Sequence, residues 1–368
     1  MTHIPSKRIA TTLLLTLTTV ALSAPPTTKP TYPPLPKIEK ARVITAEFLY
    51  DHAPFPSCHA STIVETADGT LVASFFGGTA ERNPDVCIWV TRKINGKWTP
   101  LANVADGIQP PSPDNTTKPA RYPTWNPVLF QPKGGPLQLY YKVGPKPAEW
   151  WGMVTTSTDN GATWSKPTRL PDGILGPIKD KAIQLPDGAI LSPSSVEGDG
   201  GWRVHIERST DNGVTWTRGS DLPNDQFKAI QPTFLVHAPD NIQMLCRTEQ
   251  DVLAQSTSHD EGKTWSPLQA TSLPNPNSGV DAVTLRDGRN VLVYNPTKRE
   301  DPIKGRTPLT LAVSTDGEHW SDVLTLENDY DGQYSYPAVI QLHDGLIHIT
   351  YTWRRKNIKY VVVDPTSF

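Results

Sequence analysis

Residues 157–164 read STDNGATW and fit the pattern S-x-D-x-G-x-x-W, which decides the fold of this chain. The pattern returns at 209–216 (STDNGVTW) and 258–265 (SHDEGKTW), with a copy one residue shorter at 314–320 and a degenerate copy at 91–98. In such a turn serine and aspartate side chains hydrogen-bond the backbone, glycine accepts positive φ, and tryptophan packs between sheets. We interpret this motif, the Asp-box, as a structural staple of a hairpin and assign it no chemistry.

A second repeat runs out of phase with the first. It consists of an apolar run, a tight turn and another apolar run, and its turn residues accept the positive φ that two-residue β-hairpins need. Six such turns occur, at Asp68-Gly69, Gly134-Gly135, Asp187-Gly188, Asp240-Asn241, Asp287-Gly288 and Asp344-Gly345. Their spacing of 47 to 66 residues is the length of a four-stranded propeller blade with its loops.

Together the repeats predict an all-β fold, a six-bladed β-propeller of four-stranded antiparallel blades. Each blade contains an inner strand, the tight turn, a second strand, a loop, a third strand, an Asp-box and an outer strand. Residues 41–50 (ARVITAEFLY) are expected to complete the last blade and so remove exposed sheet edges. The alternative is a seven-bladed propeller with the extra blade in the long 98–125 segment, where no further turn of this type occurs.

The N-terminus has the features of an export signal over residues 1–24. Lys7 and Arg8 precede an apolar stretch over 9–22 that is too short for a comfortable membrane span, and small residues follow it. We expect a Pro-rich linker over 25–40, the propeller domain over 41–368, and a secreted or periplasmic protein without a membrane span.

Composition narrows the classes of partner. With 35 basic and 37 acidic residues, nothing favours nucleic acid binding by bulk charge. No Cys/His cluster has metal-ligand spacing, and no motif indicates a nucleotide, flavin or haem, so no cofactor or metal is predicted. Cys58 and Cys87 fall in one predicted sheet, where they either pair or, with Cys246, remain buried thiols. A monomer is expected.

The topology places a site at the mouth opposite the tight turns. Inner strands begin at the axis, so residues about nine positions before each turn gather there: His59, Trp125, Ile178, Gln231, Ser278 and Ser335, with the neighbours Asn126, Lys179, Asn277, Tyr334 and Tyr336. The ends of the second strands add Lys142, Arg247, Asn295, Trp353 and Arg354, and the following loop adds Trp150. This mixture suits an acidic sugar, because aromatic rings stack on sugars and arginine clamps a carboxylate.

Given both repeats, the chain resembles the sialidase (neuraminidase) superfamily of BNR-repeat propellers over about residues 55–355. The resemblance implies three arginines that bind a substrate carboxylate. Arg247, in MLCR, matches the second arginine. Arg306, in GRTPLTLAVSTDG, matches the third, with Arg299 as a rival.

The resemblance also implies an acid/base aspartate and a tyrosine nucleophile assisted by a glutamate. Asp85, in the loop after the first hairpin, matches the aspartate. In the stretch QYSY, Tyr334 matches the nucleophile and is favoured over Tyr336.

Two positions depart from the superfamily pattern. His59 stands where the first arginine is expected, and Gln231 stands where the glutamate is expected. Gln231 cannot draw a proton from the tyrosine, whereas histidine titrates near neutrality and can act as a general base or acid. We therefore hypothesise that His59 takes part in the chemistry.

The sequence leaves three functions open. The first is an exo-acting hydrolase for terminal acidic sugars, sialic acid or uronate. The second is a β-elimination lyase for rhamnose–glucuronate-type termini using His59, and the third is a non-catalytic glycan-binding propeller. The predicted catalytic residues are His59, Asp85 and Tyr334. The predicted substrate-binding residues are Arg247, Arg306, Trp125, Asn126, Lys142, Trp150, Lys179, Gln231, Asn277 and Arg354.

Overall fold

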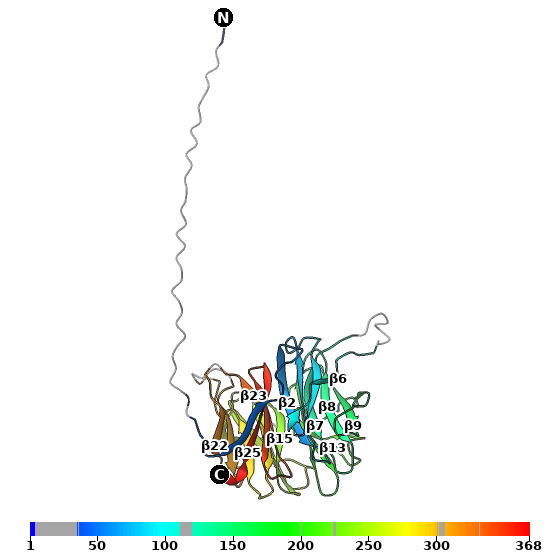
Figure 1. The fold of residues 1–368 in the computed structure, drawn as a ribbon, viewed down its shortest axis with the longest axis vertical. Coiled ribbons are helices and arrows are strands. Elements are labelled where there is room, and N and C mark those ends of the chain that lie inside the picture. The colour runs from blue at the N-terminus through cyan, green and yellow to red at the C-terminus, as the bar shows by residue number, and fades with distance from the viewer. Residues whose placement is uncertain are drawn as a thin grey trace. The chain divides into compact units, whose positions relative to one another are not determined.

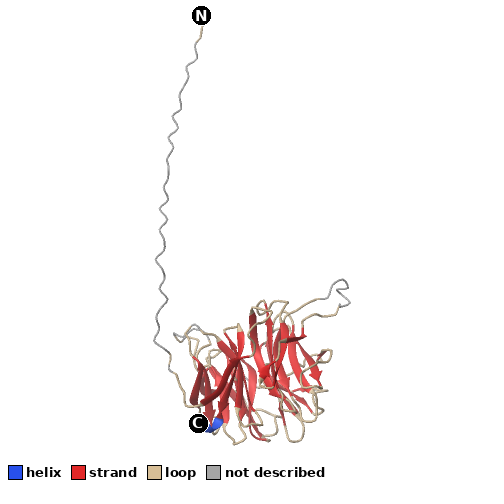
Figure 2. Ribbon diagram, in the orientation of Figure 1, coloured by secondary structure: helices blue, strands red, loops and turns tan. Residues whose placement is uncertain are grey.

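The sequence repeats become six β-sheets in the computed structural model, which describes residues 1–3, 35, 37–110, 120–198, 200–223, 226–299, 301, 306–330 and 332–368. The chain divides into two units, residues 1–33 and 34–368, and all strands belong to the second (Figures 1 and 2). Most of the predicted signal and linker lies outside the described residues. Within the described residues no helix is long and apolar enough to cross a membrane.

The first three blades follow the chain in order. The first contains β2 (Ser57–Glu65), β3 (Leu71–Gly78), β4 (Cys87–Ile94) and β5 (Lys97–Trp98), with β6 (Ala102–Ala105) also paired to β4. The second contains β7 (Thr124–Phe130), β8 (Leu137–Val143), β9 (Trp151–Ser157) and β10 (Thr168–Arg169). The third contains β11 (Ile183–Gln184), β12 (Ile190–Gly198), β13 (Gly201–Ser209) and β14 (Thr217–Arg218).

The remaining blades repeat the same antiparallel order. The fourth contains β15 (Ala229–Ala238), β16 (Asn241–Thr248), β17 (Val252–Ser258) and β18 (Gln269–Pro274). The fifth contains β19 (Asp281–Thr284), β20 (Asn290–Tyr294), β21 (Leu309–Ser314) and β22 (Ser321–Glu327). The sixth contains β23 (Tyr334–Gln341), β24 (Ile347–Trp353), β25 (Asn357–Asp364) and β1 (Arg42–Phe48). A short 3₁₀ helix, Pro365–Ser367, ends the chain.

The sixth blade closes the ring as the sequence predicts. Its outer strand β1 pairs antiparallel with β25, from Arg42 opposite Asp364 to Phe48 opposite Lys359. The six-bladed prediction is confirmed. In the long 98–125 segment, the described residues form only β5, β6, the start of β7 and an isolated bridge, so no seventh sheet is present in them.

Apolar side chains pack between each blade and the next. Val72 and Ile88 of the first blade, for example, pack with Leu139 of the second, all fully buried. Cys58, Cys87 and Cys246 are buried free thiols, and the first two do not pair in this structure.

Four inner strands carry a bulge near their start. The pairing register shifts in β2, β7, β15 and β23. At these bulges Ala60, Asn126, Gln231 and Tyr336 adopt positive φ, between 38° and 57°. This conformation is uncommon for residues other than glycine, and a bulge reorients side chains relative to a regular strand. The bulges therefore decide which side chains reach the axis.

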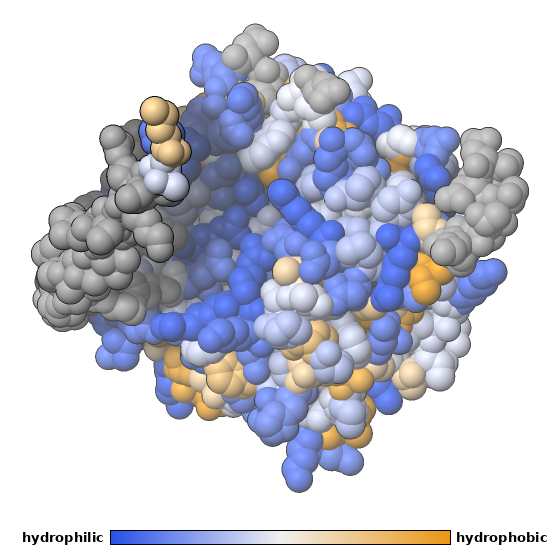
Figure 3. Space-filling model, turned by 90° about the horizontal axis from the view of Figure 1, so that it is seen from above, coloured by the Kyte–Doolittle hydropathy of each residue, from blue (hydrophilic) through white to orange (hydrophobic). Residues whose placement is uncertain are grey.

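The two faces of the propeller differ. The tight turn of the sixth blade adjoins the end of β25, since Ile347 pairs with Val363, so the turns share the face of the C-terminus at the bottom of Figure 1. The opposite face, seen from above in Figure 3, is lined with hydrophilic residues around a hollow.

Candidate functional site

Tyr336 is the centre of the polar cluster on the axis. Its phenol oxygen accepts a hydrogen bond from Arg247 Nη1 at 2.8 Å and one from Gln231 Nε2 at 3.2 Å. Arg247 Nη1 also donates to Gln231 Oε1 at 3.1 Å, and Arg247 Nε donates to Asn277 Oδ1 at 2.7 Å. Gln231 and Arg247 of the fourth blade are thus bonded to each other and to the oxygen of Tyr336 from the sixth blade.

Three cations face the Tyr336 ring. The guanidinium of Arg306 lies 5.2 Å from the ring centroid, that of Arg247 lies 5.8 Å away, and Lys179 Nζ lies 5.7 Å away. Burial lowers the pKa of Arg306 to about 10, so it stays charged at neutral pH. Donors and cations placed in this way stabilise negative charge on the phenol oxygen.

His59 packs against Tyr336 and is buried. The ring centroids are 4.1 Å apart, and His59 Nδ1 is paired with Thr352 Oγ1 at 2.9 Å. Burial, with the charges of Arg355 and Arg306, holds the pKa of His59 well below its usual range. His59 is therefore neutral at physiological pH.

A pocket of about 130 Å³ opens above this cluster. Its lining residues are Glu81, Arg82, Trp125, Asn126, Pro147, Trp150, Glu197, Ile230, Gln231, Arg247 and Tyr336. The predicted residues Trp125, Asn126, Trp150, Gln231 and Arg247 thus share one pocket, and the predicted Arg306, Asn277, Lys179 and His59 contact Tyr336 or Arg247 next to it. His59 does not belong to the lining.

Two carboxyl groups, Glu81 and Glu197, line the pocket. Glu81 Oε2 accepts a hydrogen bond from Arg355 Nη1 at 2.5 Å. Glu197 lies near the end of β12, and its pKa is raised, mainly by burial and further by Glu81, while Arg247 opposes the rise. The pocket therefore holds one carboxyl group paired with a cation and one that retains its proton to higher pH than usual.

An ionic network occupies the axis beside the cluster. Lys179 Nζ donates to Asp180 Oδ1 at 2.6 Å and to the carbonyl oxygens of Val280 and Pro337. Lys181 Nζ donates to both carboxylate oxygens of Asp281, at 2.8 and 2.9 Å. These contacts join the third blade to the fifth and sixth, and they give the Lys179 side chain a structural role.

Tyr334 and Arg354 lie apart from the pocket. Tyr334 packs in the apolar cluster between the fifth and sixth blades. Its hydroxyl donates to Asp329 Oδ2 at 2.8 Å and accepts from Arg354 Nε at 3.1 Å. Burial, followed by the bond to Asp329, raises the pKa of Tyr334 to about 12. The tyrosine bonded to Arg247 is Tyr336, and not Tyr334, which the sequence favours.

Asp85 and Lys142 are also placed elsewhere. Asp85 is exposed, and its Oδ2 accepts from the backbone N and the hydroxyl of Thr79, at 2.9 and 2.6 Å. Lys142 is fully buried, with its ammonium group bonded to the carbonyl oxygen of Pro177. Asp85 thus ties a loop together and Lys142 joins the second blade to the third, and neither lines the pocket.

The sequence contained a signal for Tyr336. In three inner strands the bulge residue precedes proline, as Asn126-Pro127, Gln231-Pro232 and Tyr336-Pro337. Aligning these dipeptides selects Tyr336 over Tyr334. The rule that the ends of the second strands reach the mouth also leads to Glu197 when it is applied to the third blade. Glu81 lies in the same loop as Asp85 and carries no such signal.

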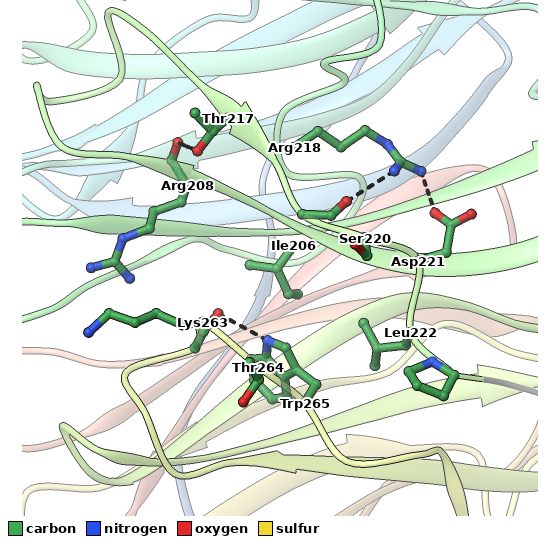
Figure 4. Close-up of a pocket in the computed structure, with 13 residues that line it drawn as sticks. Ile206, Arg208, Thr217, Arg218, Ser220, Asp221, Leu222, Lys263, Thr264 and Trp265 are labelled. Carbon is green, nitrogen blue, oxygen red and sulfur yellow. Dashed lines mark hydrogen bonds and ion pairs between the residues drawn. The ribbon is translucent and has the colours of Figure 1, made fainter.

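A larger cavity, of about 460 Å³, lies between the third and fourth blades near their outer strands. Figure 4 shows Arg218 directed toward Asp221 on one side and Trp265, from an Asp-box, on the other. The cavity contains none of the predicted site residues. This cavity is lined by an Asp-box turn and by the outer strands of the third blade. We therefore place the candidate site at the axis.

Comparison with known proteins agrees with the architecture. A model of the BNR repeat-like domain family matches residues 69–349. Among curated proteins, the chain is 33% identical over 108 residues to the xyloglucanase Xgh74A of Acetivibrio thermocellus, which covers 27% of this chain and 12% of that protein. It is 27% identical over 161 residues to a sialidase of Clostridium perfringens, which covers 38% of this chain and 41% of that protein.

These matches span less than half of the curated relatives' own length. Among solved structures, the Hadza microbial sialidase Hz136 superposes with a TM-score of 0.69 at 18% identity, which covers 85% of this chain and 66% of that one. At this identity the likeness concerns the fold alone.

Proposed function

Because this chain belongs to the BNR repeat-like domain family and has a sialidase-superfamily propeller fold, we propose that its axial pocket cleaves terminal acidic sugars, sialic acid or uronate, from glycans. The observation that carries the proposal is the Tyr336 oxygen, which accepts hydrogen bonds from Arg247 and Gln231 beside a pocket lined with carboxyl groups. We further propose that the protein acts outside the cytoplasm, on the basis of the export-signal features of residues 1–24.

The arginines supply the affinity for an acid. Arg247 lines the pocket, and Arg306 has a buried Nη1 without a hydrogen-bond partner among the described residues. A substrate carboxylate would give these N–H groups a charge-assisted acceptor. Trp125 and Trp150 provide the apolar surface on which a sugar ring packs.

Tyr336 is the proposed nucleophile. The phenol oxygen of Tyr336 attacks the anomeric carbon. Arg247 and Gln231 each donate a hydrogen bond to this oxygen and stabilise the negative charge that it carries before the attack. The neutral amide of Gln231 cannot accept the phenol proton as a glutamate would. Activation of Tyr336 therefore depends on the surrounding cations.

The experiment is a substrate panel presented to the purified protein. It contains α-sialosides, glucuronate-capped oligosaccharides, and the same compounds with the carboxyl group reduced to an alcohol. We expect release of the acidic sugar and at least a hundredfold lower kcat/KM for the reduced analogues, since they cannot engage the arginines. Equal turnover of acid and alcohol would refute the assigned specificity, and an unsaturated, ultraviolet-absorbing product would show a lyase instead.

The second candidate is a non-catalytic glycan-binding propeller. Gln231 favours it, because an amide stands where a proton acceptor for the tyrosine is expected. Saturable binding of acidic glycans, measured by calorimetry, without turnover of any panel member would select this function.

A further inference from the structure

A second hollow adjoins the axial pocket. It measures about 220 Å³ and is lined by Pro147, Ala148, Trp150, Gly173, Leu175, Val196, Glu197, Gly198 and Arg218. The two hollows share three residues, Pro147, Trp150 and Glu197. Glu197 therefore stands at the junction of a charged pocket and a more apolar one.

Packed aromatic and aliphatic side chains form one wall of the second hollow. Trp150 packs edge-to-face on Trp125, with ring centroids 5.9 Å apart, and both belong to a buried cluster with Leu175. The indole N–H of Trp150 is buried and has no hydrogen-bond partner among the described residues. Such a wall offers a sugar an apolar face.

We propose that this second hollow is the leaving-group subsite and that Glu197 donates the proton to the departing oxygen. The inference rests on the proposed function, since it concerns the same glycosidic bond. In hydrolysis that bond lies between the sugar bound by the arginines and the group that departs. A proton donor must stand between the two subsites, and Glu197 lines both.

The proton balance is simple. In the first step the phenolate oxygen of Tyr336 bonds to the anomeric carbon. The bond from this carbon to the leaving oxygen breaks, and its electron pair passes to that oxygen, which takes the proton of Glu197. In the second step water bonds to the anomeric carbon, the electron pair of the broken bond returns to the phenolate oxygen of Tyr336, and one proton of the water passes to the Glu197 carboxylate. The net reaction consumes one water.

Local electrostatics suit this role. Burial raises the pKa of the Glu197 carboxyl, and the carboxyl of Glu81 adds to the rise, so Glu197 keeps its proton at higher pH than an ordinary glutamate. Asp85, which the sequence suggests for the same role, is exposed and has a lowered pKa because of its bonds to Thr79.

The test compares leaving groups. Wild type and Glu197→Gln are assayed on an acidic sugar linked either to 4-nitrophenol, which departs without protonation, or to a second sugar, which does not. We expect kcat/KM of the variant to fall at least ~10²-fold on the disaccharide, the usual scale for general acid catalysis, and less than ~5-fold on the nitrophenyl glycoside. The alkaline limb of the disaccharide pH profile should also disappear.

Two further variants isolate the role of Glu197. Glu149→Gln changes an exposed carboxyl near Trp150 that lines neither hollow, and it should match wild type on both substrates. Ala148→Trp, at an exposed position in the hollow, should raise KM for the disaccharide. It should leave KM unchanged for a third substrate, the methyl glycoside of the same acidic sugar, which has no second sugar to occupy the hollow.

The outcomes separate this inference from the proposed function. If wild type cleaves both substrates and E197Q loses activity equally on both, Glu197 is not the proton donor. If wild type cleaves neither, the proposed function itself fails. A thermal unfolding measurement controls for misfolding of the variant. Because burial raises the pKa of Glu197, this carboxyl group destabilises the folded state at pH values above the ordinary pKa of glutamate. The melting temperature of E197Q at pH 7 should therefore be no lower than that of wild type.

Discussion

The Asp-box turns and the axial bulges both recur from blade to blade, yet only the turns repeat their side chains. In the four boxes that begin at Ser157, Ser209, Ser258 and Ser314, the serine hydroxyl donates to the aspartate at 2.7 to 2.9 Å and accepts from a glycine N–H at 2.8 to 2.9 Å. The bulges share positive φ but carry alanine, asparagine, glutamine and tyrosine. Repeated backbone builds the propeller, and unequal side chains on that backbone build the site.

The largest effect of a substitution is expected at the propeller axis. Arg247→Met should lower kcat/KM on acidic glycosides by about 10³-fold, because it removes a donor to Tyr336 and the proposed ligand of the substrate carboxylate. Steady-state kinetics measure the loss. Arg203→Met, at a partly exposed ion pair with Asp221 outside the pocket lining, is the matched control and should stay near wild type.

A smaller effect, on stability, is expected at Lys142. The sequence suggests this residue for the mouth of the propeller, and the structure buries it between two blades. Burial lowers the pKa of Lys142 to about 7. Above pH 7 the unfolded chain still binds this proton and the folded chain does not, so stability should rise with pH. Between pH 7 and 8.5 we expect a gain of about 1–2 kcal/mol that Lys142→Met abolishes, measured by urea unfolding. If the free energy of unfolding of Lys142→Met rose with pH as steeply as that of wild type, the burial of this ammonium group would be contradicted.

Breaking one Asp-box should affect stability and leave catalysis intact. Ser157→Ala leaves the buried N–H of Gly161 without its acceptor, at a cost of about 1–2 kcal/mol. Thermal unfolding should show the loss while kcat/KM per folded molecule is unchanged. A kinetic defect at equal folded concentration would mean that the turns and the axial site are not independent.

The smallest effect is expected at Asp85. Asp85→Asn should change kcat/KM less than ~3-fold, because the exposed carboxylate bonds Thr79 and does not line the pocket. A loss of 10²-fold or more on the disaccharide would restore Asp85 as the acid and exclude Glu197 from that role.

The repeats in the sequence were sufficient to predict the six-bladed architecture. Turn chemistry and apolar alternation are local properties, so the six hairpins, the Asp-boxes and even the closing strand β1 could be predicted from residue order. The arginine at the end of a regular strand, Arg247, could be placed for the same reason.

The site was less predictable because it depends on departures from regularity. Counting along a regular strand puts Tyr334 and Tyr336 on one face, and only the bulge before Pro337 decides which one meets Arg247. The burial of Lys142 and the proximity of Glu81 to Glu197 arise from loops that meet across blades, which no local pattern encodes.

The most direct test of the account compares two tyrosines two residues apart. Tyr336→Phe and Tyr334→Phe each remove one hydroxyl, from the oxygen bonded to Arg247 and from the oxygen bonded to Asp329. On a terminal acidic glycoside we predict that kcat falls by at least ~10³-fold for Y336F and by less than ~10-fold for Y334F. Equal activity of Y336F and wild type, or a larger loss in Y334F, would contradict the placement of the catalytic centre on the propeller axis.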